Sequence, residues 1–392
     1  MATLLLIILY ILAIGLGIPD SAFGSAWPAI HVDLGIDMSM ANAVSFLVSG
    51  GTIIASLFSA KLINRFGTAA VTAFSTALTV GALFGYAFSP NIWFICLLAI
   101  PMGFGGGAVD TAINSYMALR YSAMHINFTH CFYGVGVMVS PYVMSWALRG
   151  NGWRHGYIFA GILQTAIAVV SILAIPLWSK VKCCVEGAED TPPRTLAFKQ
   201  MIKSPAVVWA SLFFFASTSV EALCTGWCSS YMVHTKGFTA ADAAGYLVLY
   251  FLGLTIGRIL SGLLSNKLST WTLLKIGIGL GASGCAVLFL ASSPLFTMLG
   301  LLLIGCGVAP AFPGLSYLTP RNFGIDVSQS VTGFEISFAY SGTMISPILF
   351  GFFAKIVSTY AFPFFVLFFE IMMVICNVAL LRSLKKYKGF DK

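Results

Sequence analysis

The apolar residues of this chain fall into long runs instead of the short periodic stripes of a water-soluble protein. Polar, proline and glycine positions separate the runs, each near the length of about 20 residues that crosses the hydrocarbon core of a bilayer. We expect a spanning helix in each, because a helix satisfies its own backbone hydrogen bonds in lipid. The twelve predicted spans are 4–28, 40–62, 69–88, 92–118, 127–148, 155–178, 204–232, 241–264, 272–290, 295–317, 328–353 and 360–382.

Two other interpretations of the apolar runs are excluded. A transmembrane β-barrel needs segments of about ten residues with alternating hydrophobicity, and the sequence has none. A cleaved signal peptide needs a basic start and a cleavage site of small residues, whereas the first run lacks both and continues through Trp27. We therefore expect an all-α membrane protein that keeps its first span.

The composition and the placement of charge agree with this fold class. Only 9% of residues are charged and 58% are hydrophobic, whereas soluble domains carry about 25% charged residues. With the N-terminus inside, sixteen of the 21 Lys and Arg residues fall on the inner side, one lies within a span and four lie outside. The positive-inside rule thus predicts cytoplasmic termini and a multi-pass protein of the plasma membrane, as in a bacterial cytoplasmic membrane. The net charge of +8 is spread over short loops, which argues against nucleic-acid binding.

The longest polar stretch, 179–203, divides the chain into two halves of six predicted spans each. We expect an N-terminal bundle at 1–178, a cytoplasmic linker at 179–203 and a C-terminal bundle with a short basic tail at 204–392. The nine cysteines lack zinc-ligand spacing with partner histidines, so they are interpreted as structural thiols and no metal is expected. Cys183 and Cys184 fall on the predicted cytoplasmic linker.

The two halves carry related sequence features in the same order. Ser115, Tyr116 and Arg120 recur 201 positions later, and the segment GVGVMVSP resembles YSGTMISP in the second half. SAKLINRFG after the second span also resembles SGLLSNKLS after the eighth. Duplicated halves with a binding site between them are typical of secondary transporters.

The segment with Asn64, Arg65 and Gly67 resembles a cytoplasmic loop motif of the major facilitator superfamily, G-x-x-x-D-R-x-G-R, with Asn in place of Asp. In that family the loop forms a gate, where a basic side chain meets acidic or helix-terminal partners. The alternative is a simple positive-inside anchor. The expected gating residues are Arg65, Arg120, Arg258 and Arg321.

Charged residues within spans are costly in lipid and usually face a cavity or a partner. Asp20 and Glu221 lie at nearly the same place in the first span of each half, and tryptophans follow them at Trp27 and Trp227. We expect these four side chains to form a polar pocket for a solute. A tryptophan near a helix end is alternatively an interface anchor.

Asp110 lies in a glycine-rich stretch of the fourth span, and Asn114 follows one helical turn later on the same face. Burial disfavours the ionised form of an acid, so Asp110 is the predicted proton-coupling group. The alternative is an acid held by a neighbouring donor such as Tyr116, Arg120 or His130. The glycines at 103, 105, 106 and 107 are expected to permit close helix approach.

The fifth span places His130 and Tyr133 one turn apart, and both are candidates for solute binding, as is Asn114 of the fourth span. By the Ser-Pro alignment of the halves, Glu335 falls within one residue of the position of His130, so it is a further candidate. Glu370, on the last span, is interpreted as structural. A histidine at such a place is alternatively a hydrogen-bonded core residue.

The segments GIPDSAFGSAWP, GGGAVDTAINSYMAL and NFTHCFYGVG resemble the fucose permease-like branch of the major facilitator superfamily. The resemblance implies twelve helices in two pseudo-symmetric halves, an acid near the sugar at Asp20, and a proton-carrying acid at Asp110 followed by Asn114. The branch carries sugar-contacting amides where this chain has His130 and Tyr133, which favours a related sugar or polyol over fucose itself.

Three hypotheses for function follow. The first is a monomeric symporter, embedded in membrane lipids, that moves a sugar or similar small polar solute by alternating access, with a proton or sodium as the coupling ion. The second is a proton-driven antiporter that exports drugs or metabolites. The third, a membrane sensor or enzyme, is disfavoured because no catalytic motif and no soluble output domain is present. No cofactor is expected.

Overall fold

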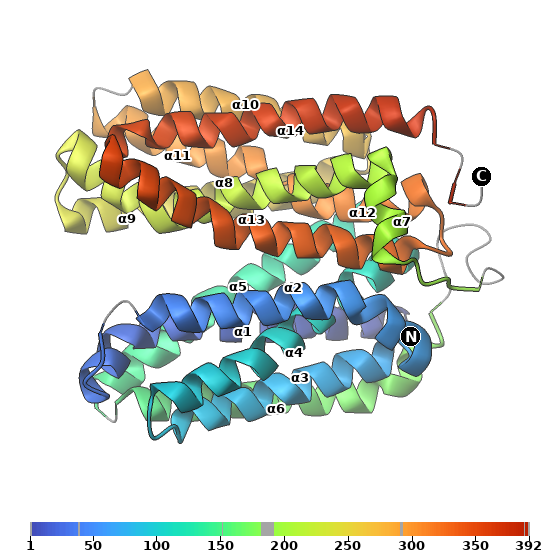
Figure 1. Ribbon diagram of the computed structural model, residues 1–392, viewed down its shortest axis with the longest axis horizontal. Coiled ribbons are helices and arrows are strands. Elements are labelled where there is room, and N and C mark those ends of the chain that lie inside the picture. The colour runs from blue at the N-terminus through green and yellow to red at the C-terminus, as the bar shows by residue number, and fades with distance from the viewer. Residues whose placement is uncertain are drawn as a thin grey trace. The chain divides into compact units, whose positions relative to one another are not determined.

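The computed structural model describes residues 2–37, 40–150, 152–181, 192–290, 293–387 and 389–390. Over these residues the chain forms α-helices and one short 3₁₀ helix, with no strand (Figure 1). The helices before the linker are α1 (Ala2–Asp33), α2 (Met40–Phe66), α3 (Thr68–Ala87), α4 (Ile92–Arg120), α5 (Ala123–Leu148) and α6 (Trp153–Trp178). The later elements are α7 (Phe198–Lys203), α8 (Pro205–Lys236), α9 (Ala240–Leu264), α10 (Thr270–Leu290), α11 (Pro294–Val308), α12 (Ala311–Phe323), α13 (Ser328–Ile356), η1 (Thr359–Ala361) and α14 (Phe362–Leu384).

Twelve helical segments in the described residues are long and apolar enough to cross a membrane, which confirms the predicted fold class. The tenth span, Pro294–Phe323, is interrupted at Ala309 and Pro310, between α11 and α12. Proline has no N–H to donate to the carbonyl one turn earlier, so the helix breaks there. The predicted linker contains the short helix α7, which Figure 1 shows turned across the axis of α8.

The chain divides into two compact units of similar size. The first comprises Met1–Tyr121, Thr129–Thr195 and Ile325–Gly333, and the second comprises Ser122–Phe128, Leu196–Gly324 and Phe334–Lys392. In the first unit α4 packs against α2 and α3, while α6 packs against α1 and α3. In the second, α8 packs against α14, and α11 packs against α9 and α10.

Glycines bring α4 and α2 together at backbone distance. A Cβ at Gly103 or Gly107 would collide with the carbonyl oxygens of Val48 and Thr52, so a larger residue would push the helices apart. The Thr52 hydroxyl donates to the carbonyl of Gly103 at 3.1 Å, which adds a hydrogen bond across the contact. Gly106 touches no other helix, so the predicted close approach fails at that one glycine. The contact fixes the helix that carries Asp110.

The Ser-Pro segments of the two halves make related bonds. Ser140 on α5 donates to the carbonyl of Ile18 on α1 at 2.7 Å, and Ser346 on α13 donates to the carbonyl of Ser219 on α8 at 3.4 Å. Each bond joins the fifth span of a half to its first span. The repeat seen in the sequence thus extends to side-chain contacts.

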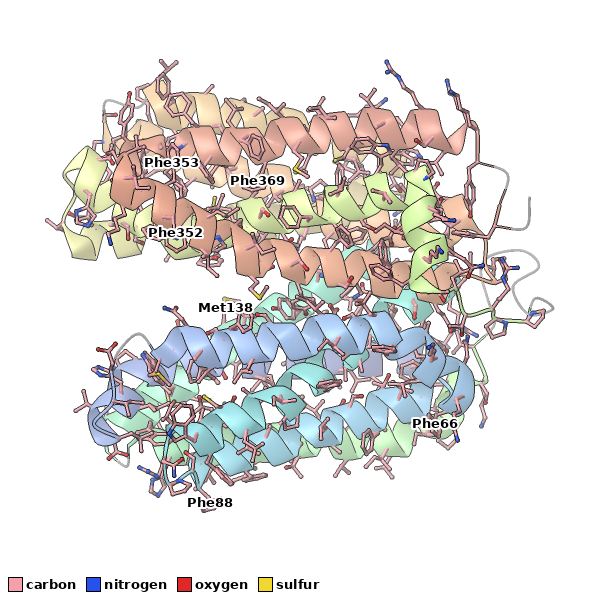
Figure 2. All side chains as sticks on the ribbon, in the orientation of Figure 1. Phe66, Phe88, Met138, Phe352, Phe353 and Phe369 are labelled. Carbon is pink, nitrogen blue, oxygen red and sulfur yellow. The ribbon has the colours of Figure 1, made fainter. Side chains whose placement is uncertain are left out.

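Large apolar side chains cover the outer surfaces of both units. Phe66, Phe88 and Phe352, labelled in Figure 2, are each more than half exposed, and Phe88, which directly follows α3, is 71% exposed. Lipid solvates such side chains, since it is as apolar as they are. The protein is therefore a multi-pass membrane protein.

Candidate functional site

The centre of the first unit holds a chain of three polar side chains from α4 and α5. The side-chain amide of Asn114 donates to Oδ1 of Asp110 at 2.7 Å and to the backbone oxygen of Asp110 at 3.0 Å. The Oδ1 atom of Asn114 lies 3.3 Å from Nε2 of His130. Asp110 is 6% exposed and Asn114 is 5% exposed, so this acid and amide are shielded from solvent, whereas His130 is partly buried.

The direction of these hydrogen bonds follows from their partners. A backbone carbonyl only accepts hydrogen bonds, so the group of Asn114 that faces Asp110 is its NH₂ group. The oxygen of Asn114 therefore faces His130, and Nε2 of His130 must carry the hydrogen. The amide links the acid to the imidazole with one defined polarity.

A second polar pair in the same unit joins α1 to α5. The hydroxyl of Tyr133 donates to Oδ2 of Asp20 at 2.7 Å, and the Asp20 side chain is exposed. The two backbones approach each other closely at Gly17, where an added Cβ would collide with the carbonyl oxygen of Tyr133. Both residues were predicted separately to bind solute, and that role stays a prediction.

Pro141 explains a further bond between α1 and α5. Its ring nitrogen has no hydrogen to donate to the carbonyl of Val137, four residues earlier. The hydroxyl of Ser21 donates to that carbonyl at 2.7 Å. Ser21 directly follows Asp20, so the bond also fixes the segment that carries the acid.

The two tryptophans occupy different environments. Trp27 is 3% exposed and packs against Phe23, with ring centroids 5.1 Å apart, so it presents little surface to a solute. The indole N–H of Trp227 donates to the carbonyl of Pro347 at 3.0 Å, and its ring packs edge-on against Phe350. Trp227 is only partly buried, which leaves part of its ring accessible.

In the second unit Glu221 forms an ion pair with Arg258. Nη2 of Arg258 on α9 lies 3.7 Å from Oε2 of Glu221 on α8. The Arg258 side chain is 8% exposed, whereas that of Glu221 is 34% exposed. Sequence analysis assigned one residue to solute binding and the other to gating, and it did not pair them.

The two remaining acids of the second unit lie deep in the protein. Glu335 has no exposed surface, and its Oε2 atom lies 2.6 Å from the hydroxyl of Thr319. Glu370 is 1% exposed, and neither carboxyl oxygen has a hydrogen-bond partner among the described residues. It lies directly against Gly281 of α10. Neither acid reaches an open surface in this conformation.

The predicted gating arginines at the span ends each stack on an aromatic ring. Arg120 lies 4.3 Å from the ring centroid of Tyr116, and Arg321 lies 3.6 Å from that of Tyr317. These equivalent pairs were part of the sequence repeat. Arg65 is exposed, lies over the ring of Phe66 at 5.3 Å, and makes no ion pair within the described ranges. Its gating role stays a prediction.

Sequence analysis missed the contacts of the linker's last residues. The amide of Asn64, at the end of α2, donates to the hydroxyl of Thr195 at 2.9 Å. The backbone N–H of Arg194 donates to the backbone oxygen of Asp326 at 2.7 Å, and their side chains lie 3.9 Å apart. Asn64, which stands where the family motif carries Asp, thus binds the linker. The change from Asp to Asn at position 64 was the only sequence feature that indicated this contact.

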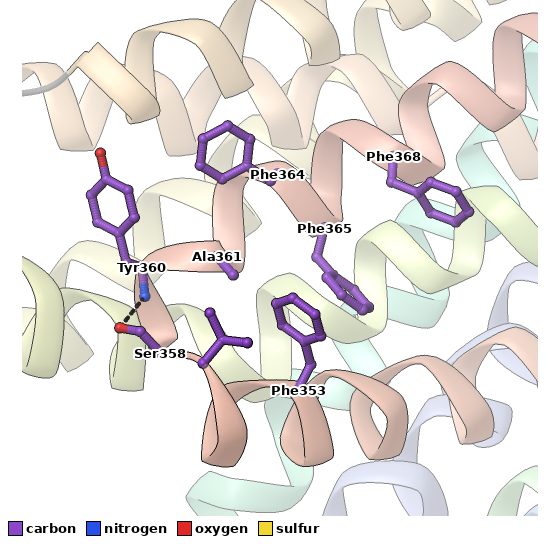
Figure 3. A pocket seen from close by; sticks show the side chains of 8 residues that line it. Phe353, Ser358, Tyr360, Ala361, Phe364, Phe365 and Phe368 are labelled. Atoms are coloured by element: carbon purple, nitrogen blue, oxygen red, sulfur yellow. Dashed lines mark hydrogen bonds between the residues drawn. The ribbon is translucent and has the colours of Figure 1, made fainter.

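An apolar pocket of about 490 Å³ lies apart from all of these residues, where α13 leads through η1 into α14 (Figure 3). Phe353, Phe364, Phe365 and Phe368 line it, and the hydroxyl of Ser358 already accepts from the backbone N–H of Tyr360. Its chemistry suits a lipid chain better than a polar solute. No cluster of three potential metal ligands occurs in the described part of the chain.

The chain resembles known transporters along most of its length. Residues 9–347 match the family model described as Major Facilitator Superfamily. Bypass of stop codon protein 6 of Saccharomyces cerevisiae is 21% identical over 88% of this chain and 76% of that protein. The 4-hydroxybenzoate transporter PcaK of Acinetobacter baylyi is 25% identical over 44% of this chain and 39% of that protein.

A solved structure shows the same fold. The fucose:proton symporter of E. coli superposes with a TM-score of 0.78 and 16% sequence identity, covering 97% of this chain and 98% of that one. The fold is therefore that of a solute transporter and not of an enzyme.

Proposed function

This chain belongs to the Major Facilitator Superfamily, and on that premise we propose that it is a proton-coupled symporter of a sugar or a similar small polar solute. The observation that carries the proposal is the polar chain of Asp110, Asn114 and His130. A carboxyl group shielded from water and tied to an imidazole through one amide is suited to bind and release a proton. The fold it shares with a fucose:proton symporter supports the same assignment.

Asp110 is the proposed proton carrier. Its Oδ1 atom accepts a hydrogen bond from the side-chain amide of Asn114, which holds the carboxyl group in place. Ionisation in a site without water is costly, so the group keeps its proton until the site opens. Asn114 and His130 would then hold the carboxylate in place while the proton leaves.

The proposed solute contacts begin with Asp20 and Tyr133, whose polar atoms lie on an exposed part of the first unit. Within the second unit, Glu221 and Trp227 are both partly exposed and are proposed as solute contacts in their own right. Hydroxyl groups of a sugar can donate to the carboxylates, while the ring face of a tryptophan can stack on the sugar's C–H surface.

The charges favour a neutral solute over an organic acid such as 4-hydroxybenzoate. The proposed contacts include two carboxyl groups, Asp20 and Glu221, and each carboxylate would repel a negatively charged solute. The buried cation of the second unit, Arg258, is already paired with Glu221. A carboxylate solute would have to break that pair to gain a partner.

Symport requires that proton binding and solute binding favour each other, a reciprocal coupling between the two sites. Protonation of Asp110 on the outer side would favour solute binding, and proton loss on the inner side would favour release. We place the protein in the cytoplasmic membrane with both termini inside, as the distribution of basic residues predicts.

Uptake into proteoliposomes tests the proposal. The solute is first identified by a thermal-shift screen of the purified protein against a sugar library, because a ligand that binds the folded state raises the melting temperature. Asp110→Asn mimics the protonated acid, so it should retain solute counterflow and lose accumulation driven by a proton gradient. Glu370→Gln, which alters another buried acid, serves as the control and should accumulate solute like the parent. Normal accumulation by Asp110→Asn would refute the assignment.

A further inference from the structure

The proposed role of Asp110 in proton coupling does not account for a second buried acid, Glu335. Glu335 lies near the start of α13, has no exposed surface, and contacts Thr319 of α12, which is 1% exposed. The Oε1 atom of Glu335 is buried and has no hydrogen-bond partner among the described residues. A carboxylate oxygen without a donor is expensive in such a place. The geometry therefore favours the neutral acid.

The hydroxyl of Thr319 fits both protonation states of this acid. It lies 2.6 Å from Oε2 of Glu335 and 3.1 Å from the carbonyl oxygen of Leu315. A hydroxyl has one hydrogen and two lone pairs. If Glu335 carries the proton, it donates to Thr319, and Thr319 donates to Leu315. If Glu335 is ionised, the Thr319 hydrogen turns to the carboxylate, and no atom other than hydrogen has to move.

Among the described residues Glu335 belongs to no ion pair, and Thr319 is the side chain that bonds to it. Arg321 follows Thr319 on α12, but its guanidinium lies over the ring of Tyr317 and donates to the backbone oxygen of Tyr317 at 2.7 Å. Phe334, which precedes Glu335, packs against Phe198 of α7. An acid in this environment is best satisfied by a proton of its own.

The contact resembles the polar chain of the first unit. Thr319 and Glu335 join the fourth and fifth spans of the second half, and Asn114 and His130 join those of the first half. The members of each pair are 16 residues apart in the chain. In the 201-residue repeat Asn114 corresponds to Leu315, one turn before Thr319 and on the same helix face.

We propose that Glu335 and Thr319 form a second proton-binding site, in the second unit and separate from Asp110. The bond that forms on proton binding is the O–H bond of Glu335. The proton comes from water when the ends of the spans move apart and water reaches the carboxyl group. No electron transfer or further reactant is involved. A part for this site in driving transport rests on the proposed function, whereas its occupancy by a proton does not.

Infrared difference spectroscopy of the purified protein in liposomes tests the occupancy without any solute. A protonated carboxyl group has a carbonyl-stretch band that is distinct from those of carboxylates and amides. At neutral pH the spectrum of the parent should contain one such band that is missing from the spectrum of Glu335→Gln. Glu370→Gln, the matched control, should leave the Glu335 band in place. Parent and Glu335→Gln spectra that agree in this region would overturn the proposal.

Variants of Thr319 keep the test valid if Glu335→Gln fails to fold. Thr319→Val removes the hydroxyl and should shift the frequency of the same band, because the acid loses its hydrogen-bond acceptor. Thr319→Ser retains the hydroxyl and should restore the parent frequency. A band unaffected by Thr319→Val would contradict the proposed site. These outcomes do not depend on transport, so they separate this site from any failure of the Asp110 assignment.

Discussion

The hydroxyl of Tyr133 lies 2.7 Å from Oδ2 of Asp20 and joins the fifth span to the first. Close packing at Gly17 and the Ser21 bond to Val137 fix both helices beside this pair. The acid is therefore presented in one orientation, while its side chain remains exposed. Such preorganisation reduces the entropy lost when a solute binds.

Tyr133→Phe should weaken solute binding by roughly tenfold, because a hydrogen bond to a charged group contributes about 1.5 kcal/mol or more. Binding can be measured by the dissociation constant of the solute identified in the screen. Tyr142→Phe is the matched control, since Tyr142 lies on the same helix and is 78% exposed. If both variants bind with parental affinity, the Tyr133 bond has no part in recognition.

The direction of the His130 hydrogen bond gives a second prediction. Nε2 of His130 must donate to Asn114, so a substitute at this position needs an N–H group. His130→Gln should keep most proton-driven accumulation. His130→Phe should lower the rate of accumulation by about tenfold, because the buried side-chain oxygen of Asn114 would lose its hydrogen-bond donor. Initial rates of uptake under an imposed proton gradient distinguish the two. Equal rates would show that His130 only fills space.

The sequence predicted the spans well because the bilayer imposes a length and a polarity that can be counted along the chain. The break at Pro310 was missed because the surrounding run is as apolar as an unbroken span. Pairing across helices was harder to predict. Glu221 and Arg258 carry opposite charges, but nothing in their spacing reveals that α8 and α9 bring them to 3.7 Å.

The sequence pattern also could not predict which side chains are buried. Trp27 and Trp227 occupy related places in the repeat, but Trp27 is buried against Phe23, while Trp227 is partly exposed and bonded to Pro347. Glu335 was predicted to bind solute because it aligns near His130, and the structure places it out of solvent. Local sequence fixes a residue's helix and face, whereas neighbouring helices decide its exposure.

The pair formed by Glu221 and Arg258 predicts a non-additive effect on stability. Glu221→Gln removes the carboxylate that forms an ion pair with the nearly buried Arg258. Removal of one partner costs about 3–5 kcal/mol for a fully buried pair and less here, because Glu221 is 34% exposed. We expect a clear fall in melting temperature for Glu221→Gln. The double variant Glu221→Gln, Arg258→Met should recover much of that loss. Thermal unfolding in detergent completes the double-mutant cycle, and additive effects would show that the charges do not interact.

The last prediction concerns the orientation of the chain. Cys183 and Cys184 lie on the predicted cytoplasmic linker and outside the described residues, whereas the other seven cysteines lie in helices. The distribution of basic residues predicts that this linker lies inside. A thiol reagent that cannot cross membranes should therefore label the protein in inside-out vesicles and fail to label it in intact cells.

The control for that experiment is the double variant Cys183→Ser, Cys184→Ser, which should abolish the labelling in inside-out vesicles. Cys131 and Cys306 are partly exposed within their spans, so label that persists in the variant would come from them and be subtracted. Label at Cys183 or Cys184 in intact cells would reverse the orientation. The proton gradient of a cell would then act on Asp110 and Glu335 from the opposite ends of the spans, and symport would still run inward because the solute moves with the proton.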